Sequence, residues 1–306
     1  MILCVTPNPA IDRTLHVTSL HVGEVHRADK TLAAAGGKGL NVARTINALG
    51  GESLCMGLIG GHTGNLLEEL AEREGLSAHW TRVKNETRTC IILVEDGKDA
   101  TVINERGADV TEEECETFVN DVWKQAEYCR FVCVSGSLPP GFSLDHFDVL
   151  LRGLVKRGKS VWVDTSGAAL KTALKLGGAN IKVNAAELGE SLGIKISNAG
   201  QAIQAGRQLL KDGISSVVVT FGKDGAVLAG RSGAWTARLP VIKAVSSVGS
   251  GDAFLGGLAF ALDLGHPFDA ALQYGAAAGA ANALHFGGGM ADRDEFGWLL
   301  DQVVVR

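Results

Sequence analysis

The chain has 306 residues, 46% of them hydrophobic, enough to bury a large core as one α/β domain or as two smaller domains. Its net charge of −5 comes from mixed charges without any run rich in Lys and Arg. This argues against a nucleic-acid partner, because such binding depends on neutralising phosphates. Forty glycines against six prolines, with no collagen-like period, direct attention to the loops, where glycine permits sharp turns and close approach to a ligand.

The N-terminal segment Met1–Pro9 has no basic region and no small-residue cleavage site, so it is not expected to be a signal peptide. No apolar run approaches the roughly 20 residues that span a bilayer. The six cysteines form no CxxC pair, and several lie in apolar, strand-like runs. We therefore expect a cytoplasmic protein with reduced, buried thiols and no membrane association.

Short β-branched runs alternate with longer amphipathic stretches along most of the chain. Because the short runs are apolar without alternating, both of their faces should be covered, which predicts a parallel sheet between helices. The predicted strands are Ile2–Thr6, Ser53–Ile59, Phe131–Ser135, Ser160–Asp164, Ile181–Val183, Val217–Thr220 and Ala226–Leu228. The predicted helices are Gly39–Leu49, Gly64–Glu74, Glu112–Gln125, Leu144–Arg157, Ala185–Leu192, Ala199–Lys211, Asp252–Leu264 and Phe268–Ala283.

Two stretches interrupt this alternation, at residues 11–34 and 80–108. They contain short strand-like runs with turns, including Cys90–Val94 and Ala100–Asn104. These segments predict a small β-sheet inserted into the larger domain, where it would act as a lid. Since there is no 20–50-residue repeat and no low-complexity linker, we expect residues 1–306 to form a single α/β domain that carries this lid.

The strongest local signal is the glycine-containing segment Ser247–Asp252, which precedes the apolar stretch Ala253–Leu264. Glycines directly before a helix leave backbone N–H groups unpaired, and the helix dipole adds to them, so the segment predicts an anion site suited to phosphate. Asp252 could take a proton from a hydroxyl while these amides stabilise a transferred phosphoryl group. The alternative, that Asp252 only caps the helix, does not explain the glycines.

A second glycine-rich segment, Ala35–Asn41, also leads into a predicted helix. Its glycines allow close backbone approach, and Lys38 and Asn41 offer polar groups to a sugar or a phosphate. A simple helix entry with a solvated lysine is the alternative. Farther along the chain, Thr220–Gly225 is a strand end with a tight turn, which taken alone predicts a hairpin.

The segment Lys182–Glu187 joins a predicted strand to a predicted helix. Asn184 with Glu187 three residues later is typical of a capping box, which is the simpler interpretation. The same two side chains could instead hold water or Mg²⁺ beside phosphates.

The segment Gly153–Ser160 matches the phosphate-loop pattern GxxxxGK[ST], but we reject this function. That motif needs a strand before it and a helix after it, whereas here the predicted helix Leu144–Arg157 comes first and the strand Ser160–Asp164 follows. Gly158 is better interpreted as the end of the helix. The sequence also lacks a GxGxxG after its first strand, a GxSxG elbow and an HExxH motif, so dinucleotide binding, serine hydrolysis and a zinc site have no support.

Taken together, these segments resemble the PfkB (ribokinase-like) carbohydrate kinase family across nearly the whole chain. Gly36–Ala43 is similar to the family's N-terminal signature and Val248–Asp252 to its C-terminal signature. Lys182–Glu187 falls where the family has Lys-Pro-Asn-x-x-Glu, with Val183 in place of proline, and Thr220–Gly225 falls at its nucleotide-phosphate turn. The branch that the sequence most resembles acts on hexose phosphates, to judge from Thr6–Asp12, Glu86–Arg88, Ser135–Gly141 and Ser246–Val248.

The resemblance implies a doubly wound, mostly parallel sheet between helices, with a small inserted β-sheet lid that often forms a homodimer contact. It implies Asp252 as the catalytic base, with the amides of Gly249, Ser250 and Gly251 around the transferred group. The residues implied to bind a sugar phosphate are Asp12, Arg27, Gly36, Gly37, Lys38, Asn41, Arg88 and Ser137. Those implied to bind ATP are Lys182, Asn184, Thr220, Gly222, Gly225 and Asn282, and Glu187 would hold Mg²⁺ through water.

The implied activity is transfer of the ATP γ-phosphoryl group to a primary hydroxyl of a ketohexose phosphate: tagatose 6-phosphate, fructose 6-phosphate or fructose 1-phosphate. The cysteine in Thr87–Ile91 slightly favours the tagatose enzymes, and a requirement for K⁺ is left open. One alternative is a ribokinase- or nucleoside-type kinase of the same fold. The other is a non-catalytic sugar- or nucleotide-binding regulator, against which the intact Asp252, Asn184 and Glu187 argue.

Overall fold

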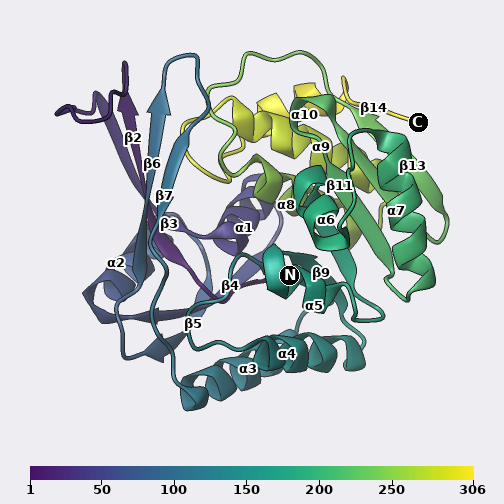
Figure 1. Cartoon of the computed structure of the whole chain (residues 1–306), viewed down its shortest axis with the longest axis horizontal. Helices are drawn as coiled ribbons and strands as arrows, with labels where there is room; N and C mark the ends of the chain where they lie inside the picture. The colour runs from purple at the N-terminus through teal and green to yellow at the C-terminus, as the bar shows by residue number, and fades with distance from the viewer.

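The computed structural model describes residues 1–306 and contains a ten-stranded and a four-stranded sheet (Figure 1). Parallel pairing joins the larger sheet from β5 to β11, and three strands add antiparallel at one edge. In spatial order the ten strands are β14 (Val304–Val305), β13 (Gly233–Arg238), β12 (Ala226–Gly230), β11 (Ser216–Thr220), β10 (Asn180–Asn184), β9 (Ser160–Asp164), β8 (Phe131–Ser135), β1 (Ile2–Thr6), β4 (Ser53–Gly60) and β5 (Ala78–Val83).

Strand order reverses at β1, from which β4 and β5 extend in one direction and β8 to β11 in the other, so the predicted doubly wound, mostly parallel sheet is confirmed. Parallel neighbours need a crossover connection, which helices supply. The helices are α1 (Lys38–Ala48), α2 (Gly61–Arg73), α3 (Glu112–Ala126), α4 (Leu144–Lys156), α5 (Gly167–Ala173), α6 (Ala185–Leu192), α7 (Ala199–Lys211), α8 (Ser250–Asp263), α9 (Phe268–Ala283) and α10 (Arg293–Leu300), with a short 3₁₀ turn, η1 (Gly222–Asp224).

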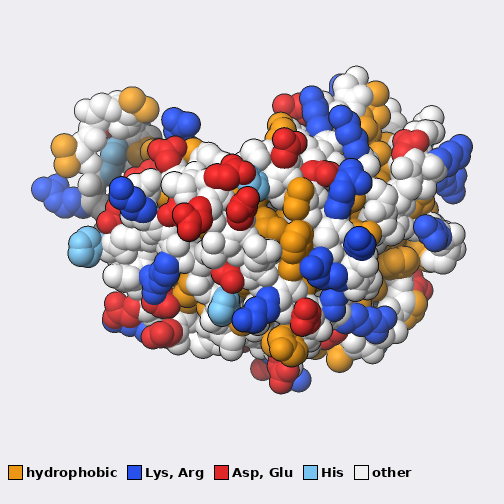
Figure 2. Space-filling model, turned by 90° about the horizontal axis from the view of Figure 1, so that it is seen from below, with side chains coloured by type: hydrophobic (Ala, Val, Ile, Leu, Met, Phe, Trp, Pro, Cys, Tyr) orange, Lys and Arg blue, Asp and Glu red, His pale blue; other side chains and the backbone are white.

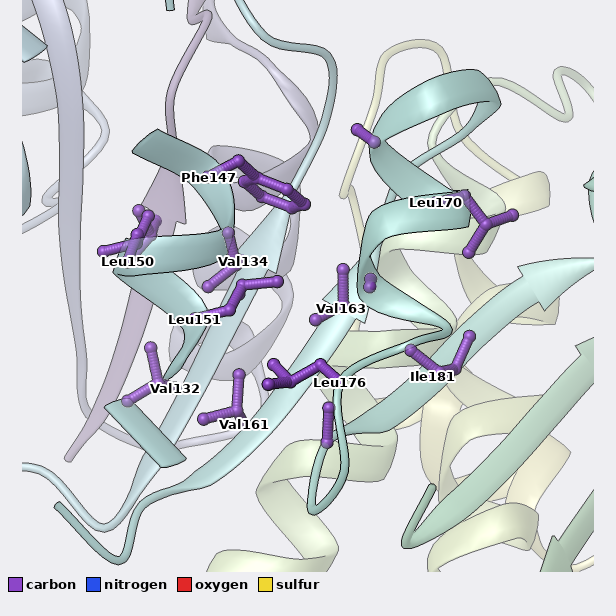
Figure 3. Close-up of a cluster of buried hydrophobic side chains, with 14 of the residues drawn as sticks. Val132, Val134, Phe147, Leu150, Leu151, Val161, Val163, Leu170, Leu176 and Ile181 are labelled. Carbon is purple, nitrogen blue, oxygen red and sulfur yellow. The ribbon is translucent and has the colours of Figure 1, made fainter. Parts of the chain in front are cut away.

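The large sheet separates two hydrophobic cores of 38 and 37 buried residues. Helices α3 to α7 cover the first core, and α1, α2 and α8 to α10 cover the second. Successive residues of a strand enter opposite cores, as Val132 and Val134 of β8 do in the first core and Phe131 and Cys133 in the second. Figure 3 shows side chains of β8 and β9 packed against Phe147 in the first core. Burial on both faces explains the non-alternating apolar runs.

All six cysteines are buried and unpaired, as expected. Three of them, Cys4, Cys55 and Cys133, are neighbours across β4, β1 and β8 and belong to the second core. None of the helices is long and apolar enough to cross a membrane. Gly158 follows the end of α4 with a φ of 71° and leads into β9, so the segment that matches a phosphate loop is a helix-to-strand turn.

The four-stranded sheet projects from the main body at the upper left of Figure 1. In Figure 2 this lobe stands at the left, and the surface is hollowed between it and the main body. The predicted second segment of this sheet began at residue 80, but residues 78–83 form β5 of the large sheet, because they pair with β4 after the α2 crossover. The four strands are, in order, β3 (Lys30–Gly36), β2 (Ala10–Val17), β6 (Arg88–Glu95) and β7 (Thr101–Asn104).

Candidate active site

Polar residues from several motifs meet at the carboxyl ends of the parallel strands. Asp164 ends β9, Asn184 ends β10, Thr220 ends β11, and Ser137 follows β8 in a loop. In an open α/β sheet, ligands bind beyond the carboxyl ends of the strands, near the point where the strand order reverses. This edge of the large sheet, beside the four-stranded sheet, is therefore the candidate site.

The segment Ser247–Gly251, which leads into the first turn of α8 and is named the anion loop, has the geometry of an anion site. Gly249 is the N-cap of α8, with a φ of 77° and no side-chain cap. The Ser250 N–H donates to the Ser247 carbonyl at 3.2 Å, whereas the N–H groups of Gly251 and Asp252 have no acceptor within the helix. A Cβ at Gly249 would lie 2.6 Å from the Cα of Gly288, and a Cβ at Gly251 would lie 2.8 Å from Lys182 Nζ. Gly249 is thus needed for packing against the backbone of Gly288 and Gly289, and the Lys182 ammonium lies directly against Gly251.

Asp252 occupies the first turn of α8 and is only 6% exposed. Its Oδ2 atom accepts a hydrogen bond from Asn41 Nδ2 at 2.8 Å. Burial raises the pKa of Asp252 to about 6, with Lys38 lowering it and Asp164 raising it further. Such a carboxylate is ionised at neutral pH and yet basic enough to accept a proton, as a general base requires.

A buried carboxylate that the sequence analysis did not single out, Asp164, joins two predicted site lysines. Its Oδ1 accepts a hydrogen bond from Lys38 Nζ at 2.7 Å, and its Oδ2 accepts one from Lys182 Nζ at 2.6 Å. Burial alone would raise the pKa of Asp164, but the two lysine charges, with Lys182 first, hold it below its ordinary value. Burial likewise opposes the charge on Lys38, but Asp164, Asp252 and Glu187 raise its pKa. Asp164 and Lys38 are therefore both charged.

The four-stranded sheet brings Asp12 to the opposite side of the site. Burial raises the pKa of Asp12 to about 6, the charges of Arg44 and Arg88 lower it, and Asp252 raises it. A Cβ at Gly36 would lie 2.2 Å from Asp12 Cγ, so the glycine makes room for this carboxylate. Gly37 follows with a φ of 112° as the N-cap of α1. The two glycines thus let the chain pass under Asp12 into the helix that carries Lys38 and Asn41.

Arg88 and Ser137 are linked through Asn8, another residue that the sequence analysis did not assign to the site. Arg88 donates to the carbonyl oxygens of Asn8 at 3.0 Å and Glu105 at 3.1 Å, and its buried Nε has no partner. Asn8 Nδ2 donates to Ser137 Oγ at 3.0 Å. Since an arginine next to serine and amide groups is a common arrangement for a phosphate, this side of the site can hold an anionic group.

A cavity of about 450 Å³ opens on the other side of the anion loop. Thr220, Gly222 and Gly225, which the sequence predicts for the nucleotide, line it together with Ser250 and Gly251 of the loop. A Cβ at Gly225 would lie 2.0 Å from the carbonyl oxygen of Ala237, so only glycine fits this turn. The rest of the wall is largely apolar, from Leu239, Pro240, Val241, Ile242, Phe254, Ala276 and Ala280. A cavity with apolar walls and an anion site at one end suits a nucleoside triphosphate, whose base is apolar and whose phosphates are charged.

Asn184 and Glu187 form the capping box of α6. Asn184 Oδ1 accepts from the Glu187 N–H at 2.8 Å, and Glu187 Oε2 accepts from the Asn184 N–H at 2.9 Å. The cap leaves the second carboxylate oxygen of Glu187 free, and oxygen ligands suit Mg²⁺, which commonly binds through one or two carboxylates, water and phosphates. The structure has no group of three or more His, Cys, Asp or Glu side chains that could hold a metal ion. The segment therefore forms the capping box, and its geometry also leaves room for the predicted role beside water or Mg²⁺.

Asn282 lies behind the anion loop, outside the wall of the cavity. Its fully buried amide donates to the carbonyl oxygen of Val248 at 2.9 Å and to Ser250 Oγ at 3.0 Å, and it accepts from the Met290 N–H at 3.0 Å. Helix α9 instead presents Gly279, Ala280 and Ala283 to the cavity. The amide of Asn282 therefore supports the loop rather than reaching a nucleotide.

Arg27 is the one predicted phosphate ligand that this chain does not bring to the site. It is exposed in the loop between β2 and β3. In β2, Ala10 pairs with Arg88 and Val17 pairs with Glu95, so this loop follows the far end of the strand. Seven residue steps separate the two ends by roughly 20 Å.

The chain is similar over its full length to known carbohydrate kinases. A family model described as the pfkB family carbohydrate kinase matches residues 5–293. A 1-phosphofructokinase of Borreliella burgdorferi is 29% identical, over 100% of this chain and 98% of its own length, and a tagatose-6-phosphate kinase of Staphylococcus epidermidis is 30% identical, over 100% and 99%. The structure of phosphofructokinase-2 from Escherichia coli in complex with fructose-6-phosphate is 25% identical, covers 98% of both chains and has a TM-score of 0.89.

The family model and the full-length relatives identify the chain as a phosphotransferase that acts on an alcohol group. Within that class, the chain belongs to the pfkB family of carbohydrate kinases. Kinases of this family use ATP, which agrees with the cavity beside the loop.

Proposed function

We propose that this chain is a cytoplasmic, ATP-dependent kinase that phosphorylates a primary hydroxyl of a ketohexose phosphate. The observation that carries the proposal is the position of Asp252. Its carboxylate lies at the anion loop, with the cavity of about 450 Å³ on one side and Asp12, Lys38 and Arg88 on the other. A base between a nucleotide cavity and a cationic pocket suits phosphoryl transfer to an already phosphorylated sugar.

In the reaction, the sugar hydroxyl lies between Asp252 and the γ-phosphorus of ATP. Asp252 takes the hydroxyl proton while the hydroxyl oxygen forms a bond to the γ-phosphorus. The bond from that phosphorus to the β–γ bridging oxygen breaks, and its electron pair leaves with ADP. The amides before and within the first turn of α8, together with Lys182, stabilise the charge on the transferring group. The products are a hexose bisphosphate, ADP and a proton.

The proposed contacts divide between two ligands. Gly36, Gly37, Asn41 and Asp12 face the sugar hydroxyls, and Lys38, Arg88 and Ser137 hold the existing phosphate. Arg27 would contribute only if its loop bends toward the site. Thr220, Gly222 and Gly225 bind the ATP phosphates from the cavity wall. Asn184 and Glu187 would hold Mg²⁺ through water, and this ion would neutralise part of the phosphate charge.

A substrate panel tests the proposal directly. Release of ADP would be measured with fructose 1-phosphate, fructose 6-phosphate and tagatose 6-phosphate, and with ribose and a nucleoside as representatives of the alternative. We expect kcat/KM to be highest for one of the sugar phosphates. Turnover confined to ribose or the nucleoside would show a ribokinase- or nucleoside-type kinase. Binding without any turnover would show a non-catalytic sugar- or nucleotide-binding regulator. Parallel assays in Na⁺ and K⁺ salts show whether the activity requires K⁺.

Replacing Arg88 by Ala is expected to raise the KM for the sugar phosphate by about tenfold or more, with a smaller effect on kcat, because charge-assisted hydrogen bonds to a phosphate contribute about 1.5–3 kcal/mol. Arg82→Ala is the matched control and should leave KM unchanged, since Arg82 lies on the preceding strand β5 of the large sheet and pairs with Glu68 at the surface. If Arg88→Ala left this KM unaltered, another group would hold the phosphate.

We also propose that the four-stranded sheet is a lid and that two copies associate through it. The face opposite Asp12 carries an apolar patch of Leu15, Ile91, Leu93 and Ile103, flanked by the polar residues Arg13, Thr89 and Thr101, and Ile103 is 58% exposed. An apolar sheet face of this kind is typical of an interface. Sedimentation equilibrium should give a homodimer, and Ile103→Lys should shift it toward the monomer. A monomeric parent chain at micromolar concentration would contradict this assembly.

A further inference from the structure

Arg44 of α1 has no assigned role, although every one of its five N–H donors has an acceptor. Nε and one terminal nitrogen donate to Glu74 Oε2, and the same terminal nitrogen donates to the Ala35 carbonyl at 2.7 Å. The other terminal nitrogen, Nη1, donates to Asn41 Oδ1 at 2.8 Å and to the Gly288 carbonyl at 2.8 Å. The side chain is buried, so none of these bonds can be exchanged readily for water.

These contacts determine which way the Asn41 amide points. A guanidinium has only donors, so the atom of Asn41 that faces Arg44 must be the carbonyl oxygen. The amide nitrogen then faces Asp252, to which it donates at 2.8 Å. In the flipped orientation the NH₂ group would oppose the Arg44 donors, and the amide oxygen would oppose the Asp252 carboxylate. Both contacts of the flipped amide would be repulsive.

We propose that Arg44 is a positioning residue for the catalytic base, which it serves by keeping the Asn41 amide N–H turned toward the Asp252 carboxylate. This inference rests on the proposed function, in which Asp252 accepts the substrate proton. An N–H donor favours the ionised carboxylate, whereas an amide oxygen at the same place favours the protonated acid. Without Arg44 the amide can rotate, and the base is then protonated over more of the neutral pH range.

The charges around Asp252 do not replace this hydrogen bond. Lys38 from α1 and Lys182 from β10 favour the carboxylate, whereas Asp164 from β9 and Asp12 from the four-stranded sheet disfavour it. Both lysines are already bonded to Asp164. The Asn41 amide is thus the side chain that donates a hydrogen bond to Asp252. Its orientation decides whether it favours the ionised or the protonated form of Asp252.

Arg44 also holds the 287–289 segment, which packs against Gly249 of the anion loop. The neighbouring residue Thr45 provides a matched control. Its Oγ1 donates to the Gly289 carbonyl and to the main-chain carbonyl of Asn41, each at 3.1 Å, and makes no bond to the Asn41 side-chain amide. Thr45→Val removes an anchor of the same segment and keeps the shape of the side chain. A pH effect that is present in the Arg44 variant and absent in Thr45→Val therefore reports on the amide and not on the loop.

The test variant is Arg44→Met combined with Glu74→Gln, since Arg44→Met alone would leave the Glu74 carboxylate unpaired in a partly buried place. Arg44→Lys is the second variant, because one ammonium cannot bond Glu74, Ala35, Asn41 and Gly288 together. The pH dependence of kcat would be measured at saturating substrates. In the parent enzyme, kcat should fall below about pH 6, since a protonated Asp252 cannot accept the hydroxyl proton.

We expect the acid limb of kcat to move up by about one pH unit in the double variant, with much of the lost activity recovered at pH 9. Arg44→Lys should give a smaller shift, and Thr45→Val should give none. Loss of activity at every pH without a shift of the limb would show that Arg44 is only structural, and would overturn the inference.

A second measurement does not depend on turnover. In protein labelled with ¹³C at the aspartate carboxyl carbons, the Asp252 signal is assigned from its loss in Asp252→Asn and then titrated. The same upward shift of the pKa is expected at this carbon, although Arg44 also lowers the pKa of Asp12. An unchanged Asp252 titration would refute the role of Arg44. If the parent chain phosphorylated none of the sugars, the proposed function would fail, while this titration would still decide the contact between Arg44, Asn41 and Asp252.

Discussion

Replacing Asp252 by Asn is expected to lower kcat by about 100- to 10,000-fold, the usual contribution of a general base. The amide has the size of the carboxylate but cannot take the hydroxyl proton. ATP binding should change little, because Asp252 does not line the nucleotide cavity. The measurements are ADP release under steady-state conditions and calorimetric titration with ATP.

Two further variants make this result specific. Asp263→Asn, the same substitution at the other end of α8, removes only a 3.6 Å ion pair with the N-terminus and should leave kcat unchanged. Asp12→Asn tests the other carboxylate whose pKa is raised to about 6, and it should act mainly on the KM for the sugar. Near-normal turnover of Asp252→Asn, or a loss of kcat in Asp12→Asn with KM preserved, would remove Asp252 from the role of base.

Replacing Asp164 by Asn should lower both stability and activity. Its carboxylate is fully buried and accepts from two lysine ammonium groups, at 2.7 and 2.6 Å. An asparagine offers one acceptor oxygen and turns its NH₂ group toward the other ammonium. Removing one member of a buried charge cluster costs about 3–5 kcal/mol, because the remaining charges lose their partner. We expect a decrease of this size in the free energy of unfolding in urea, and a large loss of kcat as Lys182 loses its place at the anion loop.

The control for Asp164 is Asp148→Asn, which breaks a 2.6 Å pair with the exposed Arg152 on the outer side of α4 and should leave the free energy of unfolding almost unchanged. The double variant Asp164→Asn/Lys182→Met separates folding from catalysis. Removal of the second charge should restore part of the stability, but not the activity. If Asp164→Asn unfolded like the parent and turned over normally, the two lysines would not depend on this carboxylate.

The elements that the sequence predicts best are those whose signals are local. The bounds of β1, β8, β9, α6, α7 and α9 agree with the prediction. The three strands and α9 are mostly buried, α6 has both a capping box and a left-handed glycine at its end, and the Asn198 side chain caps the start of α7. The elements that were missed, β13, β14, α5 and α10, are short or lie at the edge of the fold, where polar residues weaken the pattern. Residues 78–83 were misplaced because only pairing with β4 assigns them to the large sheet.

The sequence by itself determined the two glycine-rich helix entries of the site, because a phosphate-binding turn needs particular residues at adjacent positions. Asp252, Lys38 and Asn41 were found for this reason. Asp164 and Arg44 were not: Asp164 is 126 residues from Lys38, and Arg44 is 244 residues from Gly288. No local pattern records such contacts, since they exist only once parallel strands and the helices above them are packed. The sequence therefore predicts the glycine-rich helix entries and the candidate base, whereas only tertiary packing decides which buried charges and amides hold them in place.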